Sequence, residues 1–134
     1  MAVLEFNGYK VKEMSYKSNP NFKKEKNLFL NPKLKVENNV QDNKIEVNLY
    51  VKVGSLDDES MPFEVKCAVE GTFVYNADQD ENNMGVDVFI RNNAVAILYP
   101  YIRSLVATLT TSSNEFPGYN MPTINVGEVL KEKN

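Results

Sequence analysis

The sequence contains no histidine and a single cysteine among its 134 residues. Without histidine the chain lacks the commonest general base and metal ligand, and it cannot form a Ser–His or Cys–His nucleophile pair. One cysteine, Cys67, excludes an internal disulfide and favours a reducing compartment. Because Cys67 falls on the apolar side of a predicted strand, we interpret it as a small buried hydrophobe and not as a reactive thiol.

Positive charge is also scarce, since 15 Lys and Arg against 18 Asp and Glu give a net charge of −3. Nucleic-acid-binding proteins are usually basic, so we expect no nucleic-acid partner. No run approaches the ~18 apolar residues of a transmembrane helix, and the N-terminus lacks the basic and apolar regions of a signal peptide. The sequence therefore predicts a soluble cytoplasmic protein without membrane insertion.

A metal or cofactor site is not predicted either. The acidic stretch 78–82 suggests a calcium loop, but the sixth and twelfth positions hold Asn83 and Phe89 where an EF-hand needs Gly and Glu. The glycines do not have the spacing of a phosphate-binding loop. An enzyme or small-molecule binder stays open as an alternative, and it would require carboxylates that converge in a deep polar pocket.

Alternation of apolar and polar side chains predicts antiparallel strands in the first two thirds of the chain. Residues 44–53 are the clearest case, because their apolar side chains all fall on one face. Further strands are predicted at residues 4–15, 33–37 and 63–75. The polar link 38–43 predicts a hairpin. Gly8 and Gly71 interrupt two of the strands, and we predict a β-bulge at each.

Apolar residues then recur every three or four positions, which predicts a helix over residues 93–111 with Asn92 or Asn93 as its N-cap. Pro100 falls inside this range and predicts either a kink or a later start of the regular helix. A short last helix is predicted at residues 126–132. Because the strands come first and the helices follow, the sequence predicts an α+β fold with helices on one face of an antiparallel sheet.

Four short motifs in the second half of the chain carry a family resemblance. They are Glu70-Gly71-Thr72-Phe73 in a predicted strand, Tyr99-Pro100-Tyr101-Ile102-Arg103 in the predicted helix, Phe116-Pro117 after it, and Met121-Pro122-Thr123-Ile124-Asn125-Val126 before the last helix. In type, order and spacing they resemble the SecB family of export chaperones. The resemblance is specific over residues 63–130 and is limited to strand order before residue 60.

This resemblance implies a single SecB-like domain over residues 1–134. The implied fold is a four-stranded antiparallel sheet with a long helix and a short C-terminal helix packed on one face. The family forms a homotetramer built as a dimer of dimers, and it holds unfolded or precursor polypeptides in an apolar groove without nucleotide or metal. It delivers them to the translocation motor SecA. The implied function is therefore that of a holding chaperone and not of an enzyme.

Large apolar residues in irregular segments are the candidates for polypeptide binding. Core packing is the alternative for any single one of them, but as a cluster they favour a contact surface. The candidates are Phe22, Leu28, Phe29 and Leu30 in the crossover after the first strand, and Phe116, Tyr119 and Met121 after the long helix. Their selectivity should be low, because an unfolded chain offers apolar side chains in any order.

The predicted helix is apolar on more than one side, which usually means that it is buried on more than one side. One face of the helix carries Ile97, Tyr101, Leu105 and Leu109, and further apolar residues lie elsewhere on its surface. We predict that Val95, Ile102 and Val106 face a second subunit.

Two departures from the family affect the predicted partners. The chain stops soon after Leu130, which predicts a short last helix without the family's acidic tail, and the outward sheet face mixes lysines with glutamates. Both departures weaken the predicted contact with SecA. A dedicated partner protein on the same fold, such as the chaperone of a toxin–antitoxin pair, is therefore the second hypothesis.

Overall fold

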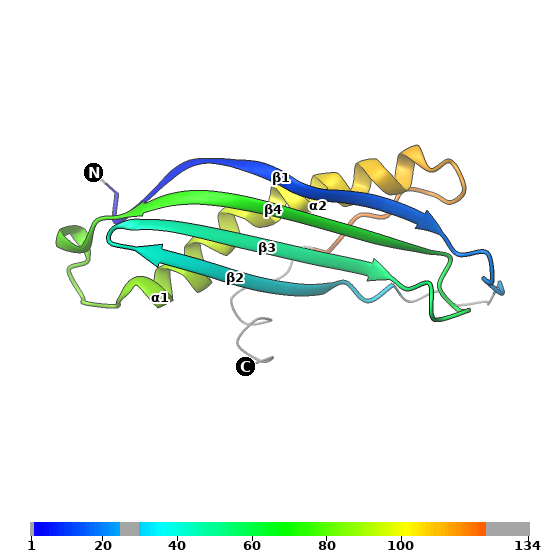
Figure 1. Cartoon of the computed structure of the whole chain (residues 1–134), viewed down its shortest axis with the longest axis horizontal. Coiled ribbons are helices and arrows are strands. Elements are labelled where there is room, and N and C mark those ends of the chain that lie inside the picture. Colours follow the sequence, from blue (N-terminus) through cyan, green and yellow to red (C-terminus); the bar gives the residue numbers. More distant parts are fainter. Residues whose placement is uncertain (1, 25–29, 123–134) are drawn as a thin grey trace.

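Four strands form one antiparallel sheet in a computed structural model that describes residues 2–24 and 30–122. The strands are β1 (Leu4–Ser18), β2 (Lys33–Gln41), β3 (Lys44–Gly54) and β4 (Phe63–Tyr75), and their order in the sheet is β1-β4-β3-β2 (Figure 1). β2 and β3 pair as the predicted hairpin. The prediction of a four-stranded antiparallel sheet is confirmed.

A long helical segment follows the sheet in the sequence. A separate 3-10 turn (Ala77–Gln79) precedes it, and the segment itself comprises α1 (Val86–Phe89), a π-helical turn (Ile90–Ala94) and α2 (Val95–Ser112). Asn92 and Asn93 lie inside the π-helical turn, so the prediction that either caps the helix is wrong. Pro100 lies within α2. The predicted helix at residues 126–132 lies outside the described residues.

The two predicted bulges have different outcomes. Gly8 adopts a φ of 103°, and the register of β1 against β4 shifts between Phe6 and Tyr9, which confirms a bulge there. Gly71 stays in register opposite Val47, so the prediction of a bulge at this glycine is wrong. Gly71 is required for another reason: a Cβ at this position would clash with the side chain of Leu98 on α2. The helix therefore packs directly on the backbone of β4.

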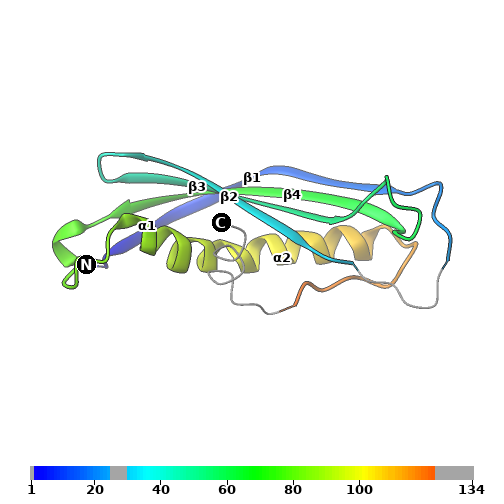
Figure 2. The same cartoon turned by 90° about the horizontal axis from the view of Figure 1, so that it is seen from below.

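The hydrophobic core lies between α2 and one face of the sheet (Figure 2). The side chains of α2 that face the sheet include Val95, Ile102 and Val106, none of which has any exposed surface. These three were predicted to face a second subunit, whereas they lie in the core of the chain itself. Ile97 is partly buried against the same core, and Tyr101 stacks on Tyr9 of β1. On the sheet the core contains Ile45, Val47, Leu49, Val53, Val65, Val69 and Phe73.

The helical stretch Val86–Ser112 is long and apolar enough to cross a membrane by length and composition. The expectation that no run approaches the length of a transmembrane helix is wrong on this criterion. Burial explains part of this apolar character, because Val95, Leu98, Tyr99, Ile102 and Val106 of α2 lie in the core of the chain. The sheet thus accounts for the apolar residues on the buried side of the helix.

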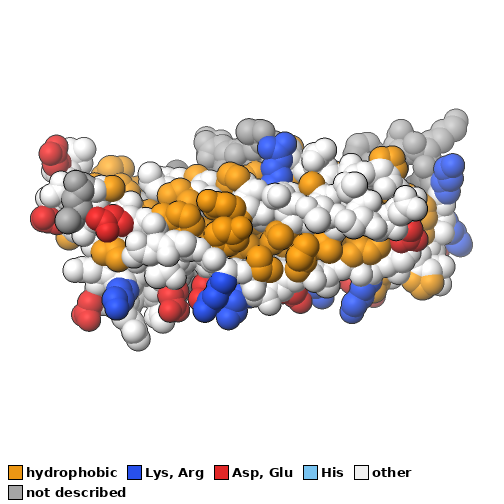
Figure 3. All heavy atoms as spheres, turned by 90° about the horizontal axis from the view of Figure 1, so that it is seen from above, with side chains coloured by type: hydrophobic (Ala, Val, Ile, Leu, Met, Phe, Trp, Pro, Cys, Tyr) orange, Lys and Arg blue, Asp and Glu red, His pale blue; other side chains and the backbone are white. Residues whose placement is uncertain are grey.

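A band of hydrophobic side chains lies where β1 meets α2 (Figure 3). We call it the β1 stripe, and we define it by Tyr9, Val11, Met14 and Tyr101, which are exposed despite their size. The rings of Tyr9 and Tyr101 are stacked with their centroids 4.1 Å apart, which connects strand and helix. Because β1 is an edge strand, the stripe lies beside unpaired backbone groups of the sheet.

Candidate functional site

An apolar pocket of about 260 Å³ opens at the end of the molecule where α2 terminates. Three segments that are distant in the sequence supply its walls: the end of the crossover, the start of β4 and the loop after α2. The residues that line it are Leu30, Phe63, Phe116, Pro117, Gly118 and Tyr119. Leu30, Phe116 and Tyr119 are half-buried, so they combine contact with the core and access to solvent. The pocket can therefore receive an apolar group from outside.

Hydrogen bonds hold the loop after α2 in place. The backbone N–H of Tyr119 donates to Oγ1 of Thr110 at 2.8 Å, and the Tyr119 hydroxyl donates to the backbone oxygen of Leu30 at 3.2 Å. Burial raises the pKa of the Tyr119 hydroxyl, so this donor stays protonated at neutral pH. The crossover and the loop are thus connected across the pocket by the side chain of one residue.

The end of β1 contributes a second connection to the same loop. Glu115 accepts hydrogen bonds from the Tyr16 hydroxyl at 3.0 Å and from Oγ of Ser18 at 2.8 Å. The ring of Phe116 contacts Phe22 edge-on, with centroids 5.8 Å apart, and it lies 6.1 Å from the ring of Phe63. An aromatic cluster therefore forms one side of the pocket and reaches the crossover.

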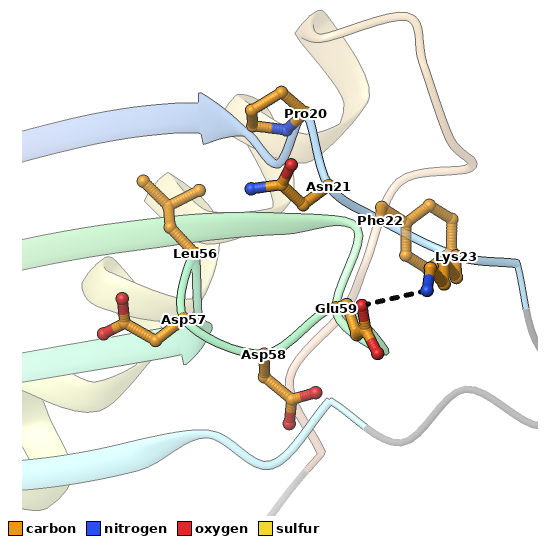
Figure 4. Close-up of a pocket in the computed structure, with 8 residues that line it drawn as sticks. All are labelled: Pro20, Asn21, Phe22, Lys23, Leu56, Asp57, Asp58 and Glu59. Atoms are coloured by element: carbon orange, nitrogen blue, oxygen red, sulfur yellow. Dashed lines mark ion pairs between the residues drawn. The ribbon is translucent and has the colours of Figure 1, made fainter.

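A larger and more polar hollow of about 850 Å³ lies next to this cluster. Two loops form it: residues 20–23 after β1 and residues 56–59 between β3 and β4 (Figure 4). Asn19 holds the loops together, because its Nδ2 donates to the backbone oxygens of Asp58 at 3.0 Å and of Met61 at 2.8 Å. Phe22 lines the hollow and contacts Phe116, so the two cavities share a boundary.

The acidic residues of the hollow do not form a catalytic arrangement. Asp57, Asp58 and Glu59 are consecutive and exposed, and Glu59 forms an ion pair with Lys23 at 3.4 Å. Hydrogen bonds from Ser60 lower the pKa of Asp58, whereas a carboxyl that acts as a general acid needs a raised pKa. Within residues 2–24 and 30–122, no group of three or more acidic, His or Cys side chains could hold a metal ion.

The residues predicted from the sequence to bind polypeptide fall into three groups. Leu30, Phe116 and Tyr119 line the apolar pocket, and Phe22 contacts its wall. Met121 is fully buried, so it cannot contact a ligand and belongs to the core. Leu28 and Phe29 lie outside the described residues.

Phe63 was not among the predicted binding residues, although its ring forms part of the pocket wall. Its regular alternation with Glu64 made it look like an ordinary core position of β4. Its role in the pocket could have been predicted from its position as the first residue of β4, because a side chain at the start of a strand can contact a loop as well as the sheet.

The Cys67 thiol is buried in the core, as predicted. Burial raises its pKa to about 11, and the nearby carboxylate of Glu13 adds to the shift. The thiol is therefore protonated at neutral pH, and a protonated thiol is a poor nucleophile.

The chain is similar to known proteins in sequence and in fold. Residues 2–134 match the family described as "Preprotein translocase subunit SecB". An uncharacterized protein from Methanocaldococcus jannaschii is 29% identical over 143 residues, which cover 98% of this chain and 88% of that protein. A SecB-like chaperone from Mycobacterium tuberculosis, in complex with a ChAD peptide from the HigA1 antitoxin, has a TM-score of 0.69 at 13% identity over 90% of each chain. A protein of unknown function from Streptococcus agalactiae has a TM-score of 0.53 at 12% identity, covering 90% of this chain and 97% of that one.

Proposed function

The chain belongs to the SecB family, and from that premise we propose that it is a holding chaperone that binds non-native polypeptides in the cytoplasm. The family consists of non-enzymatic chaperones. One observation of this chain carries the proposal: large apolar side chains from three segments meet in a pocket that stays open to solvent. A sealed core would leave no such opening, and exposed apolar groups of this kind favour contact with another molecule.

The size of the pocket fits side-chain recognition. At about 260 Å³ it lies below the usual range for whole small-molecule ligands, roughly 300–1,000 Å³. Burying one apolar side chain contributes about 25 cal/mol per Å² of apolar surface, so a single pocket binds weakly. A long unfolded chain that occupies several such pockets, on several copies of the protein, is held by avidity.

Aggregation suppression tests this proposal. The protein is added to an unfolded substrate at an equimolar ratio of tetramer, and light scattering follows aggregation. We expect strong suppression by the wild type. Phe116→Ala should weaken client binding about 10-fold, because an aromatic side chain supplies much of the apolar contact area of a binding site.

Met84→Ala is the matched control, because Met84 is 51% exposed and does not line the pocket. It should suppress aggregation as well as the wild type does. Thermal unfolding of both variants separates loss of binding from loss of fold. The proposal is wrong if the folded wild type leaves light scattering unchanged.

A dedicated partner is the second candidate function, and one observation favours it. The structurally similar chaperone from Mycobacterium tuberculosis binds a peptide from an antitoxin. The same fold can therefore bind a segment of one particular protein. Cross-linking followed by mass spectrometry in the source cells distinguishes the two candidates: a single dominant partner supports the dedicated role, and many unrelated partners support general holding.

Assembly is part of the proposal. The β1 stripe contains Tyr9, Val11 and Met14 on an unpaired edge strand, a combination that favours association with another chain. We assign the stripe to the contact between two copies within a dimer of dimers. Val95, Ile102 and Val106 cannot form this contact, because they have no exposed surface.

Engagement of SecA stays a prediction from the resemblance, as does a role in export. A direct test is co-sedimentation of the protein with purified SecA in the presence and absence of a precursor polypeptide. Binding to precursor without binding to SecA would favour a holding role outside the export route.

A further inference from the structure

The loop that follows α2 turns back toward the sheet directly after the helix. α2 ends at Ser112, and Asn114 adopts a φ of 58°, a left-handed conformation that Asn tolerates better than most residues. The next two residues have different partners. The carboxylate of Glu115 reaches β1, whereas the ring of Phe116 lines the apolar pocket. A contact with the end of β1 therefore lies immediately beside a pocket residue in the sequence.

Two hydroxyl groups of β1 hold the Glu115 carboxylate. Oε1 accepts a hydrogen bond from the Tyr16 hydroxyl at 3.0 Å, and Oε2 accepts one from Oγ of Ser18 at 2.8 Å. Among residues 2–24 and 30–122, no lysine or arginine forms an ion pair with Glu115. Hydrogen bonds to an ionised acceptor are stronger than those between neutral groups. Burial raises the pKa of the Tyr16 hydroxyl, so this donor stays protonated at neutral pH.

These hydrogen bonds belong to a closed set of contacts around the pocket wall. The ring of Tyr16 lies 5.3 Å from the ring of Phe63, which in turn lies 6.1 Å from the ring of Phe116. Phe116 follows Glu115 in the sequence, and Glu115 accepts the hydrogen bond from Tyr16. Phe63 and Phe116 line the pocket, whereas Tyr16, Ser18 and Glu115 do not. The last three residues support the wall from behind, and we call them the Glu115 anchor.

The remainder of the loop has attachments of its own. The backbone N–H of Tyr119 donates to Thr110 on α2, and the Tyr119 hydroxyl donates to the backbone oxygen of Leu30. Loss of Glu115 would leave both of these hydrogen bonds in place. The Glu115 anchor therefore acts on the first part of the loop, where Phe116 lies, and not on the attachment of the whole loop.

From these contacts we propose that Glu115 is a positioning residue for polypeptide binding. Together with Tyr16 and Ser18, it holds Phe116 against Phe63 and so keeps the pocket in the shape that accepts an apolar side chain. The inference rests on the proposed holding function and assigns control of affinity at the same pocket. Ordering a loop during binding costs free energy, so a pocket that is already formed binds more tightly. Without the anchor, Phe116 has to be ordered each time a polypeptide binds.

Fluorescence anisotropy of a labelled peptide tests the proposal. The probe is a Gly/Ser peptide with several spaced phenylalanines, and the same peptide with alanines is the control ligand. We expect the wild type to bind the phenylalanine peptide and not the alanine peptide. Glu115→Ala should weaken binding about 5-fold, because both hydrogen bonds are lost. Tyr16→Phe and Ser18→Ala should each weaken it about 2-fold, because each removes one donor.

A double-mutant cycle separates positioning from a merely structural role. If Glu115 acts through Phe116, adding Glu115→Ala to the Phe116→Ala variant should change affinity less than about 2-fold. Independent, additive losses would overturn the proposal. Glu115→Gln should stay within about 2-fold of the wild type, because the glutamine amide can still form hydrogen bonds with both hydroxyls.

Glu81→Ala is the matched control, because it removes the same charge from an exposed loop position outside the pocket. It should change affinity less than about 2-fold. We expect every variant to be folded at the assay temperature, with a Tm within about 5 °C of the wild type. The Tyr16→Phe/Ser18→Ala variant makes the same test without any change in the loop, and it should match the loss caused by Glu115→Ala.

Three further results would contradict the proposal. Unchanged affinity of Glu115→Ala would show that the anchor does not shape the pocket. Tighter binding by this variant would show that the anchor restricts access to the pocket. In both cases the wild type still binds the peptide, so the holding function stands. A wild type that does not bind the phenylalanine peptide would contradict the holding function and the positioning role together.

Discussion

Met14 and Cys67 are direct partners on the same face of the sheet, yet 43% of Met14 is exposed and only 1% of Cys67. The residues differ little in chemistry, since both are apolar and contain sulfur. They differ in position: Cys67 lies on β4, inside the sheet, and belongs to the core, whereas Met14 lies on the edge strand β1. The same alternation of apolar residues therefore produces a sealed core in the central strands and an open surface at the edge.

Covered apolar residues contribute to the stability of the chain, whereas uncovered ones are available for contact with other molecules. Apolar residues in the central strands stabilise the chain by burial within it. The exposed apolar surface of the β1 stripe can gain the same free energy only by contact with another molecule. Substitutions at covered and uncovered positions should therefore have different effects.

The largest effect is expected in the covered part of the sheet. Leu49→Ala removes a fully buried side chain of β3 and should lower the free energy of unfolding by about 2–5 kcal/mol. Val40→Ala is the control, because Val40 is 39% exposed on β2 and its loss should cost less than about 1 kcal/mol. Urea unfolding measures both. Equal losses would show that the covered and uncovered positions do not differ in energy.

A smaller effect on stability, but a large one on assembly, is expected at the β1 stripe. Val11→Glu/Met14→Glu places charge on an exposed apolar surface. It should convert the oligomer to a smaller species at micromolar concentration, because burial of the stripe against another copy becomes unfavourable. Light scattering coupled to size-exclusion chromatography measures the mass.

The control for the stripe is Met84→Glu, at an exposed methionine outside it, which should leave the mass unchanged. A wild-type protein that is already monomeric would refute the assignment of the stripe to a subunit contact. The charged variant should still unfold cooperatively, since neither side chain lies in the core.

The smallest effect concerns the pH dependence at Cys67. Its pKa is raised from 9.0 to about 11 in the folded chain, so the unfolded thiol ionises first as pH rises. The stabilisation that comes from a protonated thiol is complete below about pH 9 and is lost between about pH 9 and pH 11. The difference in unfolding free energy between wild type and Cys67→Ala should therefore shrink over that interval. A difference that does not vary with pH would mean that the thiol is less buried than its position indicates.

Much of the fold could be predicted from local patterns. The alternation along residues 44–53 predicted β3 and its buried face, and the hairpin with β2 followed from a short polar link. The bulge at Gly8 was visible because a phase change moves apolar residues to the other face. Each of these signals depends only on neighbouring residues.

The candidate site was predicted in part. Phe116 and Tyr119 were recognised because large apolar residues in a loop are unusual, and the structure places them in one pocket with Leu30. Met121 carried the same signal but is buried, because a loop residue can also complete a core. Sequence composition cannot distinguish a pocket residue from a core residue, because large apolar side chains are favoured at both kinds of position.

The sequence by itself determined the strands, the long helix and the absence of histidine-based chemistry. It did so because periodicity and composition are properties of consecutive residues. Only the tertiary structure decided that Val95, Ile102 and Val106 face the sheet, while Tyr101 reaches the surface. An α-helix with apolar residues around most of its circumference has no preferred side of its own. The choice depends on which side chains fit the sheet, as Leu98 does where Gly71 leaves space.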